Sequence, residues 1–169
     1  AAVAAGAKLF QLLACPFDAM GATMATYCGQ NVGACKLDRL GRGIRSCTAL
    51  GLGWSLLVLC AMLAFAPQCA MLFLAPSEEQ LALLVELTAR YTVIQVSFYF
   101  PLALVNIVRF SIQGMGFSNL AILAGVMEMF ARMGVATLLV PAIGYTGACF
   151  ASPAAWICAD LFLIPASCW

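Results

Sequence analysis

Residues 46–75 read SCTALGLGWSLLVLCAMLAFAPQCAMLFLA, an apolar run without a charged side chain. In an α-helix this run would extend about 45 Å at 1.5 Å per residue, which exceeds the roughly 30 Å thickness of a bilayer's hydrocarbon core. Strands of membrane barrels are about 10 residues long and alternate in polarity, and this run does neither. The stretch therefore predicts a transmembrane α-helix.

Apolar segments of similar character lie on both sides of this run. We expect helices over residues of about 1–30, 46–75, 81–113, 119–141 and 146–169. Proline, glycine and acidic residues separate the later segments, at 75–80 (APSEEQ), 114–118 (GMGFS) and 143–147 (IGYTG). The sequence thus predicts an all-α fold, a polytopic bundle of about five membrane-spanning helices that forms a single transmembrane domain over residues 1–169.

The composition supports a membrane protein and excludes several function classes. Hydrophobic residues make up 64% of the chain and charged residues 9%, whereas a soluble domain carries about 25% charged residues. The net charge of +1 leaves no basic surface for a nucleic-acid partner. The chain has no histidine, and its nine cysteines form no CxxC pair, so we expect no metal site. Without a phosphate-binding loop or nucleophile motif, we predict no catalytic residue, no cofactor and no enzymatic activity.

Basic residues are concentrated in the connector over residues 31–45. It holds four of the eight basic residues of the chain, namely Lys36, Arg39, Arg42 and Arg45. By the positive-inside rule, this connector is expected to be cytoplasmic in a multi-pass protein of the plasma membrane, with membrane lipid as a partner. Because the chain begins with alanine and ends within an apolar stretch, we expect it to be a fragment of a longer polytopic protein.

Polar residues recur along the third segment at intervals of three or four, which places them on one helix face. They are Gln95, Tyr99, Asn106, Arg109 and Gln113, with Leu102 in the same row. Facing lipid, each polar group would cost free energy, and the arginine most of all. The stripe is therefore expected to line a hydrated cavity or to pack against another helix. Pro101 in the same segment predicts a kink.

Ionisable residues occur inside other segments as well. Asp18 lies deep in the first segment, on the face that carries Lys8 and Gln11. It is a candidate for cation binding or proton relay. Alternatively, it is the partner of Lys8 or of a charge on another helix. Glu128 and Arg132 in the fourth segment are spaced i,i+4, which lets them pair. This pair either holds the helix against its neighbours or takes part in ion or substrate movement. The second segment, without a charge, is the expected lipid-facing periphery.

Residues 26–39, TYCGQNVGACKLDR, resemble the segment that follows the eighth helix of MATE (multidrug and toxic compound extrusion) transporters. That family typically has Gln-Asn-x-Gly-Ala-Gly-Lys followed by Asp-Arg, and Cys35 replaces the usual last glycine. Other stretches resemble the tenth helix and its exit turn (106–118), the eleventh helix (around 128–132) and the start of the twelfth (144–156). The motif residues are Gln30, Asn31, Gly33, Ala34, Arg39, Gly114, Gly116, Pro153 and Trp156.

The resemblance implies a twelve-helix transporter with two six-helix lobes, of which this chain holds helices eight to twelve of the C-terminal lobe. Such proteins export diverse, often cationic organic compounds and drugs in exchange for Na⁺ or H⁺ by alternating access. The missing N-terminal lobe of the same protein would then be a partner. Some branches of the family use a carboxylate in helix ten, and the third segment has none within its membrane span.

Two alternatives remain open at this stage. A lipid-linked oligosaccharide flippase of the same superfamily would need a strongly cationic cavity, for which Lys8, Arg109 and Arg132 are the candidates. A non-transporting membrane scaffold remnant would use its helices only for packing.

Overall fold

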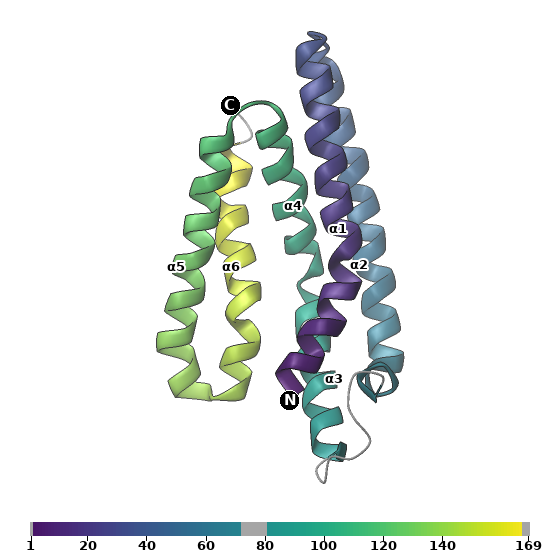
Figure 1. Cartoon of the computed structure of the whole chain (residues 1–169), viewed down its shortest axis with the longest axis vertical. Coiled ribbons are helices and arrows are strands. Elements are labelled where there is room, and N and C mark those ends of the chain that lie inside the picture. Colours follow the sequence, from purple (N-terminus) through teal and green to yellow (C-terminus); the bar gives the residue numbers. More distant parts are fainter. Residues whose placement is uncertain (1, 72–80, 167–169) are drawn as a thin grey trace.

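The computed structural model of the chain describes residues 2–71 and 81–166 (Figure 1). Its helices are α1 (Ala2–Gly33), α2 (Leu40–Met71), α3 (Leu81–Ser97), α4 (Tyr99–Gly114), α5 (Ser118–Ile143) and α6 (Tyr145–Ala166), and a single 3₁₀ turn, Leu37–Arg39, precedes α2. The described ranges contain no strand, so the predicted all-α fold is confirmed. The predicted break at 75–80 and the expected end of the last helix lie outside the described residues.

The helices form two pairs with a broken helix between them (Figure 1). The long helices α1 and α2 run side by side, and α5 and α6 form the second pair. Helix α4 lies between the pairs and contacts α1, α5 and α6, while α3 packs against α1 and α2. Helix α4 can therefore present side chains to both pairs.

Within residues 2–71 and 81–166, three helices are long and apolar enough to cross a membrane: Leu37–Met71, Ser118–Pro141 and Tyr145–Pro165. The bent pair formed by α3 and α4 makes a fourth if it counts as one span. Helix α1 is not among these candidates although it has 32 residues. The polar residues of α1, which include Lys8, Gln11 and Asp18, lower its hydropathy. Among the five membrane-spanning helices that the sequence predicted, α1 is therefore the one that is not a candidate span.

The third predicted helix is broken rather than continuous. Its two parts, α3 and α4, meet at Phe98 with a bend of 50°. Pro101 explains the position of the break, because its nitrogen cannot donate to the carbonyl of Ser97 and its ring would clash with that group. Around the break, the Phe98 N–H donates to the Gln95 carbonyl at 3.1 Å in a tighter turn. The polar stripe is therefore divided, with Gln95 on one part and Asn106 and Arg109 on the other.

A cluster of aromatic residues ties α1 to α4 and α6. Tyr99 is fully buried, and its ring centroid lies 5.6 Å from that of Phe10 and 5.2 Å from that of Phe17, both in edge-on geometry. Its hydroxyl donates to the Phe10 carbonyl at 3.1 Å. Phe10 also stacks on Trp156 of α6 at 5.7 Å. Edge-on and offset ring pairs add stability beyond the area that they bury.

The closest approach of α1 and α4 depends on glycine. A Cβ atom built on Gly114 would lie 2.8 Å from the Ala25 Cα and closer still to the Ala25 carbonyl oxygen, while one on Gly29 would lie 3.1 Å from the Gly114 oxygen. These neighbours are backbone atoms, which cannot move aside as a flexible side chain could. Small residues at such crossings let helix backbones pack closely in membranes.

The end of α1 shows how the motif at residues 30–35 folds. The Lys36 N–H donates to the Asn31 carbonyl at 2.8 Å, and the Cys35 N–H donates to the Val32 carbonyl at 3.0 Å. Cys35 has a φ of 55°, in the left-handed region that favours glycine. These bonds define a Schellman motif with Cys35 at the left-handed position, where the MATE pattern has glycine.

Replacing Cys35 with glycine is expected to raise the free energy of unfolding by about 1 kcal/mol, because an L-residue in the left-handed region costs roughly 1–2 kcal/mol that glycine does not. Equilibrium unfolding of the detergent-solubilised protein measures the change. The matched control is Cys60→Gly, at an exposed position inside α2, where glycine should lower stability by up to about 1 kcal/mol. Equal stability of Cys35→Gly and the wild type would contradict this reading of the helix end.

Large apolar side chains cover the outer surface. On α2 they include Leu50, Leu57 and Leu63, and on α5 they include Ile122 and Leu138. In an apolar 18-residue stretch of α5 only 6% is buried, against 28% in the corresponding stretch of α2. Helix α5 is therefore even more peripheral than α2, the segment expected to face lipid. A soluble surface of this kind would be prone to association, whereas a bilayer solvates it. The chain is therefore a multi-pass membrane protein.

Candidate functional site

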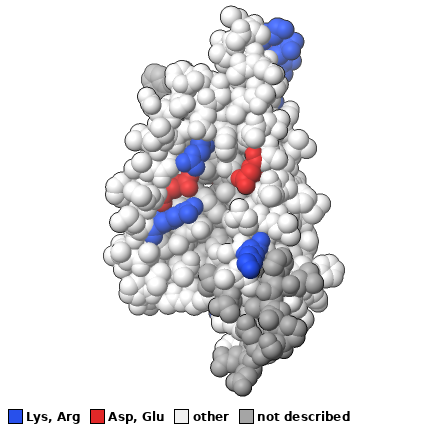
Figure 2. Space-filling view, viewed as in Figure 1, with Lys and Arg blue, Asp and Glu red and all other residues white. Residues whose placement is uncertain are grey.

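A pocket of about 250 Å³ lies between α1, α4, α5 and α6. Most of its polar lining comes from side chains that would cost free energy in contact with lipid, namely Gln11, Asp18, Asn106, Arg109, Glu128 and Arg132. Figure 2 shows acidic and basic side chains gathered in the middle of one face of the molecule, apart from a basic group at one end. One water molecule needs about 10–15 Å³ of cavity volume, so the pocket has room for several water molecules.

One wall of the pocket joins α1 to α4. The Asn106 amide donates to the Asp18 carboxylate across this junction at 3.4 Å, close to the upper limit for a hydrogen bond. Asp18 is exposed and has no ion-pair partner within the described parts of the chain. Lys8, a possible partner from the sequence, instead borders a separate, mostly apolar pocket with Ala7, Leu12 and Cys15. Asp18 is thus a carboxylate that is free to receive a cationic group.

The opposite wall joins α4 to α5 through a shared carboxylate. Arg109 donates to Glu128 at 2.9 Å, and Arg132 lies 3.6 Å from the other oxygen of the same carboxylate. The side chains of Arg109 and Glu128 are 26% and 14% exposed, whereas that of Arg132 is 51% exposed. The pairing expected from the i,i+4 spacing is therefore present, but the shorter and more buried ion pair is the one between helices.

Gly125 makes room for the interhelical pair. A Cβ atom at this position would lie 2.6 Å from Nη2 of Arg109. Gly125 lies about one helical turn before Glu128, so the guanidinium passes over the glycine to reach the carboxylate. An ion pair at bilayer depth offsets the cost of two isolated charges, which would otherwise be several kcal/mol.

Helix α6 closes the pocket with Ser152 and Trp156. Trp156 is 3% exposed and stacks on Phe10, so it forms a flat aromatic surface at the edge of the site. Asp160, one turn further along α6, is also buried, and its Oδ1 has no hydrogen-bond partner among the atoms that the structure describes. The pocket therefore combines charged groups with an aromatic surface.

Three of the predicted pathway residues lie outside the pocket. Gln95 is buried and donates to the Cys149 carbonyl of α6 at 3.3 Å, and Tyr99 is buried in the aromatic cluster. Gln113 is exposed near the end of α4. The polar stripe was expected either to line a cavity or to pack against another helix. Its first two members pack against other helices, whereas Asn106 and Arg109 line the pocket.

The motif residues lie at helix ends and in the interior of α6. Gln30, Asn31 and Gly33 belong to the end of α1, which Ala34 follows directly. There the Asn31 amide donates to the Tyr27 carbonyl at 2.8 Å. Arg39 lies in the 3₁₀ turn before α2, and Gly116 in the turn between α4 and α5. Pro153 is buried in α6 beside the pocket-lining Ser152. Of the motif residues, only Trp156 lines the pocket.

Sequence reasoning missed several apolar contributors to the pocket, among them Phe10, Ala14 and Val105, together with Ser152. Ala14 lies between Gln11 and Asp18 at helical spacing, so the periodicity of α1 contained a signal for it. Phe10 and Val105 carry no polarity that would separate them from lipid-facing neighbours. Within the described ranges no three histidine, cysteine or acidic side chains come close enough to hold a metal ion.

A comparison with protein-family models finds a match to the MatE family over residues 1–144. Searches of curated proteins and of solved structures found no match. The matched range contains both walls of the pocket, from Asp18 on α1 to Arg132 on α5, together with the motif at the end of α1. Because the match covers well over half of the sequence, the chain belongs to the MatE family of membrane transporters.

Proposed function

We propose that the protein is part of a secondary-active efflux antiporter, which exports diverse, often cationic organic compounds and drugs in exchange for Na⁺ or H⁺. The observation that carries this proposal is the charged pocket at the level of the membrane spans. Its two arginines share Glu128, whereas Asp18 is paired with no cation in the described structure. A cationic compound would place its charge at Asp18 and its flat part against Phe10 and Trp156.

Alternating access would use the position of α4 between the two helix pairs. The Asp18–Asn106 contact joins α4 to α1, and the Arg109–Glu128 pair, one turn further along α4, joins it to α5. Binding of an ion or a substrate at either contact would favour one arrangement of the helices over the other. The break at Phe98 gives α4 a point at which it can tilt relative to α3.

The partner across the open side of the pocket would be an N-terminal lobe of the same protein, with the plasma membrane as the location and connector 31–45 on the cytoplasmic side. The grouping of basic residues at the end of α1 and the start of α2 supports this orientation. Two lobes that meet over the pocket would enclose the substrate and exclude water during transport.

Transport of ethidium, a flat aromatic cation, by the protein with this lobe in proteoliposomes tests the proposal. A Na⁺ gradient and a pH gradient are imposed separately. Asp18→Asn keeps the shape of the side chain and removes its charge, so we expect transport to fall about tenfold or more, the effect of losing one contact to a charged group. The matched control is Asp38→Asn, at an exposed carboxylate paired with Arg42, which should stay within about twofold of wild type. Wild-type transport by Asp18→Asn under both gradients would contradict the proposal.

The flippase alternative finds less support in the pocket. An anionic headgroup would need cationic groups that are free to bind it, and Arg109 and Arg132 both contact Glu128. We therefore place a cationic compound, rather than a lipid headgroup, in the transport pathway.

A further inference from the structure

We propose that the groove between α1 and α2 binds one anionic phospholipid, with the phosphate beside Arg39 and Arg42 and an acyl chain along the apolar groove next to them. This site is separate from the transport pocket and independent of the proposed antiport. It rests on two adjoining cavities, one polar and one apolar, and on the charge around the polar one.

The polar cavity lies where α1 and α2 meet the 3₁₀ turn. It has a volume of about 450 Å³ and is lined by Tyr27, Arg39, Arg42, Gly43 and Ser46. The Tyr27 hydroxyl donates to the Arg39 carbonyl at 3.1 Å, which fixes the turn against α1. A Cβ atom on Gly43 would clash with the Tyr27 ring, so this glycine lets the ring lie against α2. The cavity is therefore shaped by backbone and ring contacts as well as by flexible side chains.

The charges around this cavity suit a phosphate. Residues 36–45 contain four basic side chains and one acidic side chain, Asp38, for a net charge of +3. Asp38 pairs with Arg42 at 2.8 Å and holds that guanidinium at the cavity. Arg39 forms no ion pair in the part of the chain that the structure describes. One arginine is thus positioned and the other has its charge available, and arginine is well suited to contact phosphate oxygens.

The apolar groove continues from the polar cavity along the same two helices. It has a volume of about 530 Å³ and shares Tyr27, Gly43 and Ser46 with the polar cavity. Met20, Met24, Cys47 and Leu50 supply apolar surface. The hydroxyl of Thr23, which also borders the groove, donates to the Ala19 carbonyl at 2.8 Å, so it does not require a partner from a ligand. Away from Ser46, which borders the polar cavity as well, an acyl chain would therefore meet a mostly apolar surface.

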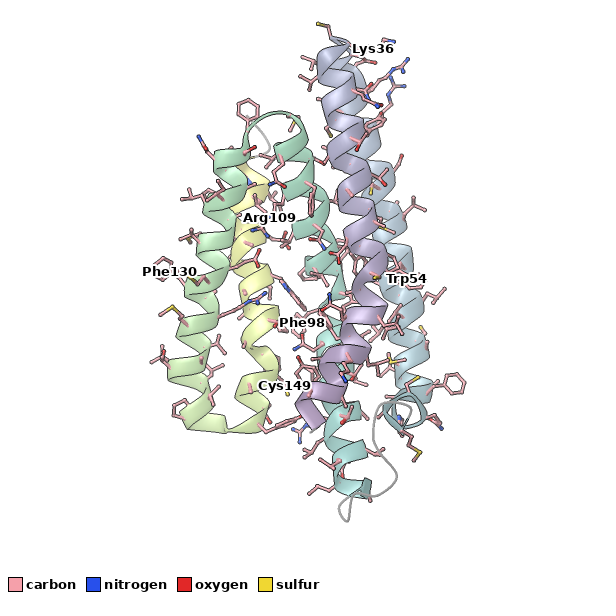
Figure 3. The ribbon with its side chains drawn as sticks, viewed as in Figure 1. Lys36, Trp54, Phe98, Arg109, Phe130 and Cys149 are labelled. Carbon is pink, nitrogen blue, oxygen red and sulfur yellow. The ribbon has the colours of Figure 1, made fainter. Side chains whose placement is uncertain are left out.

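The position of the two cavities favours a phospholipid over a soluble anion. Lys36 and its basic neighbours lie at one end of the molecule (Figures 2 and 3). The charge-free run of α2 begins at Ser46, which borders both cavities. Clusters of basic residues next to a membrane span attract anionic lipids. A headgroup cavity at the charged end and an acyl groove along the span match the two parts of one lipid.

Native mass spectrometry of the purified full chain in detergent tests the site. The probes are palmitoyl-oleoyl phosphatidylglycerol, phosphatidylcholine with the same acyl chains, and glycerol phosphate as a headgroup without a chain. We expect the phosphatidylglycerol to bind at least about fivefold more tightly than the phosphatidylcholine, and the glycerol phosphate more weakly than either lipid. Arg39→Gln should weaken phosphatidylglycerol binding about fivefold. Ala19→Phe, which fills the exposed groove, should weaken the binding of both lipids.

The matched control is Arg45→Gln, which removes the same charge from the same basic segment but from outside the cavity, where Arg45 donates to the Gly41 carbonyl. It should change phosphatidylglycerol binding less than twofold. Equal losses in Arg39→Gln and Arg45→Gln would indicate diffuse attraction and overturn the site. Unchanged lipid binding in Ala19→Phe, or equal binding of the two lipids by wild type, would overturn it as well. The readout involves no transport, so failure here leaves the antiport proposal separately testable.

Discussion

Replacing Glu128 with glutamine is expected to lower the free energy of unfolding by about 3 kcal/mol and to abolish transport. The substitution keeps the size of the side chain but leaves the guanidinium groups of Arg109 and Arg132 close together without the carboxylate that both contact, at 2.9 and 3.6 Å. Removing one partner of a buried ion pair typically costs about 3–5 kcal/mol. The lower end applies here, because Arg109 is 26% exposed in a pocket that can hold water.

Two further variants separate this explanation from a general packing defect. Arg132→Gln removes the half-exposed partner and should cost less than about 1 kcal/mol. The double variant Glu128→Gln with Arg109→Gln replaces the charged pair with a neutral one, so it should recover most of the stability lost by the single variant. Unfolding of the detergent-solubilised protein measures all three. Wild-type stability of Glu128→Gln would contradict the shared carboxylate.

Replacing Gly114 with alanine is expected to lower the free energy of unfolding by about 2–3 kcal/mol, because the added methyl group would overlap the backbone of Ala25. Neither backbone can yield locally, so α1 and α4 must move apart. The Asn106–Asp18 contact bridges the same two helices at 3.4 Å and should be lost, and cation binding at Asp18 should weaken with it. Equilibrium unfolding and ethidium binding measure the two effects.

The control for this substitution is Gly53→Ala in α2, where a Cβ atom would meet nothing within 4 Å. Alanine in an open helical position should stabilise the protein by roughly 0.5–1 kcal/mol relative to glycine. Opposite signs for the two glycine-to-alanine changes would show that the space at Gly114, rather than helix propensity, decides the outcome. A stabilising effect of Gly114→Ala would contradict the close crossing of α1 and α4.

The helices could be predicted from the sequence because hydropathy and punctuation are local. The run over residues 46–75 identified α2, and glycines marked the ends of α4 and α5. The break at Phe98 was only implied by Pro101, since proline predicts a disturbance without fixing whether a helix bends or divides. The exposure of α5 could not be predicted, because periodicity alone does not say which neighbours a helix has.

The contacts within the pocket could likewise be predicted only in part from the sequence. Glu128 and Arg132 are four residues apart, so their contact could be read from spacing, but the stronger contact of Glu128 joins residues that are 19 positions apart. The Asn106–Asp18 contact spans 88 positions. Gln95 and Asn106 share one stripe in the sequence, yet the 50° bend directs one toward α6 and the other into the pocket. Such tertiary pairings depend on helix packing that one sequence does not specify.

The proposed transport pathway requires that Asn106, and the charged groups beside it, face a water-filled pocket rather than lipid. Phe130 offers a comparison on the outer side of α5, two positions from Glu128, where it is 59% exposed (Figure 3). Asn106→Cys and Phe130→Cys would each be placed in a background whose native cysteines are replaced by alanine, reconstituted in vesicles, and treated with a charged, water-soluble methanethiosulfonate reagent.

Because thiolates form in water and not in hydrocarbon, we predict that Asn106→Cys reacts at least about tenfold faster than Phe130→Cys. Membrane-permeant N-ethylmaleimide, applied to unfolded samples, confirms that both thiols are present. A reaction of Asn106→Cys as slow as that of Phe130→Cys would contradict the hydrated pocket and the transport pathway proposed from it.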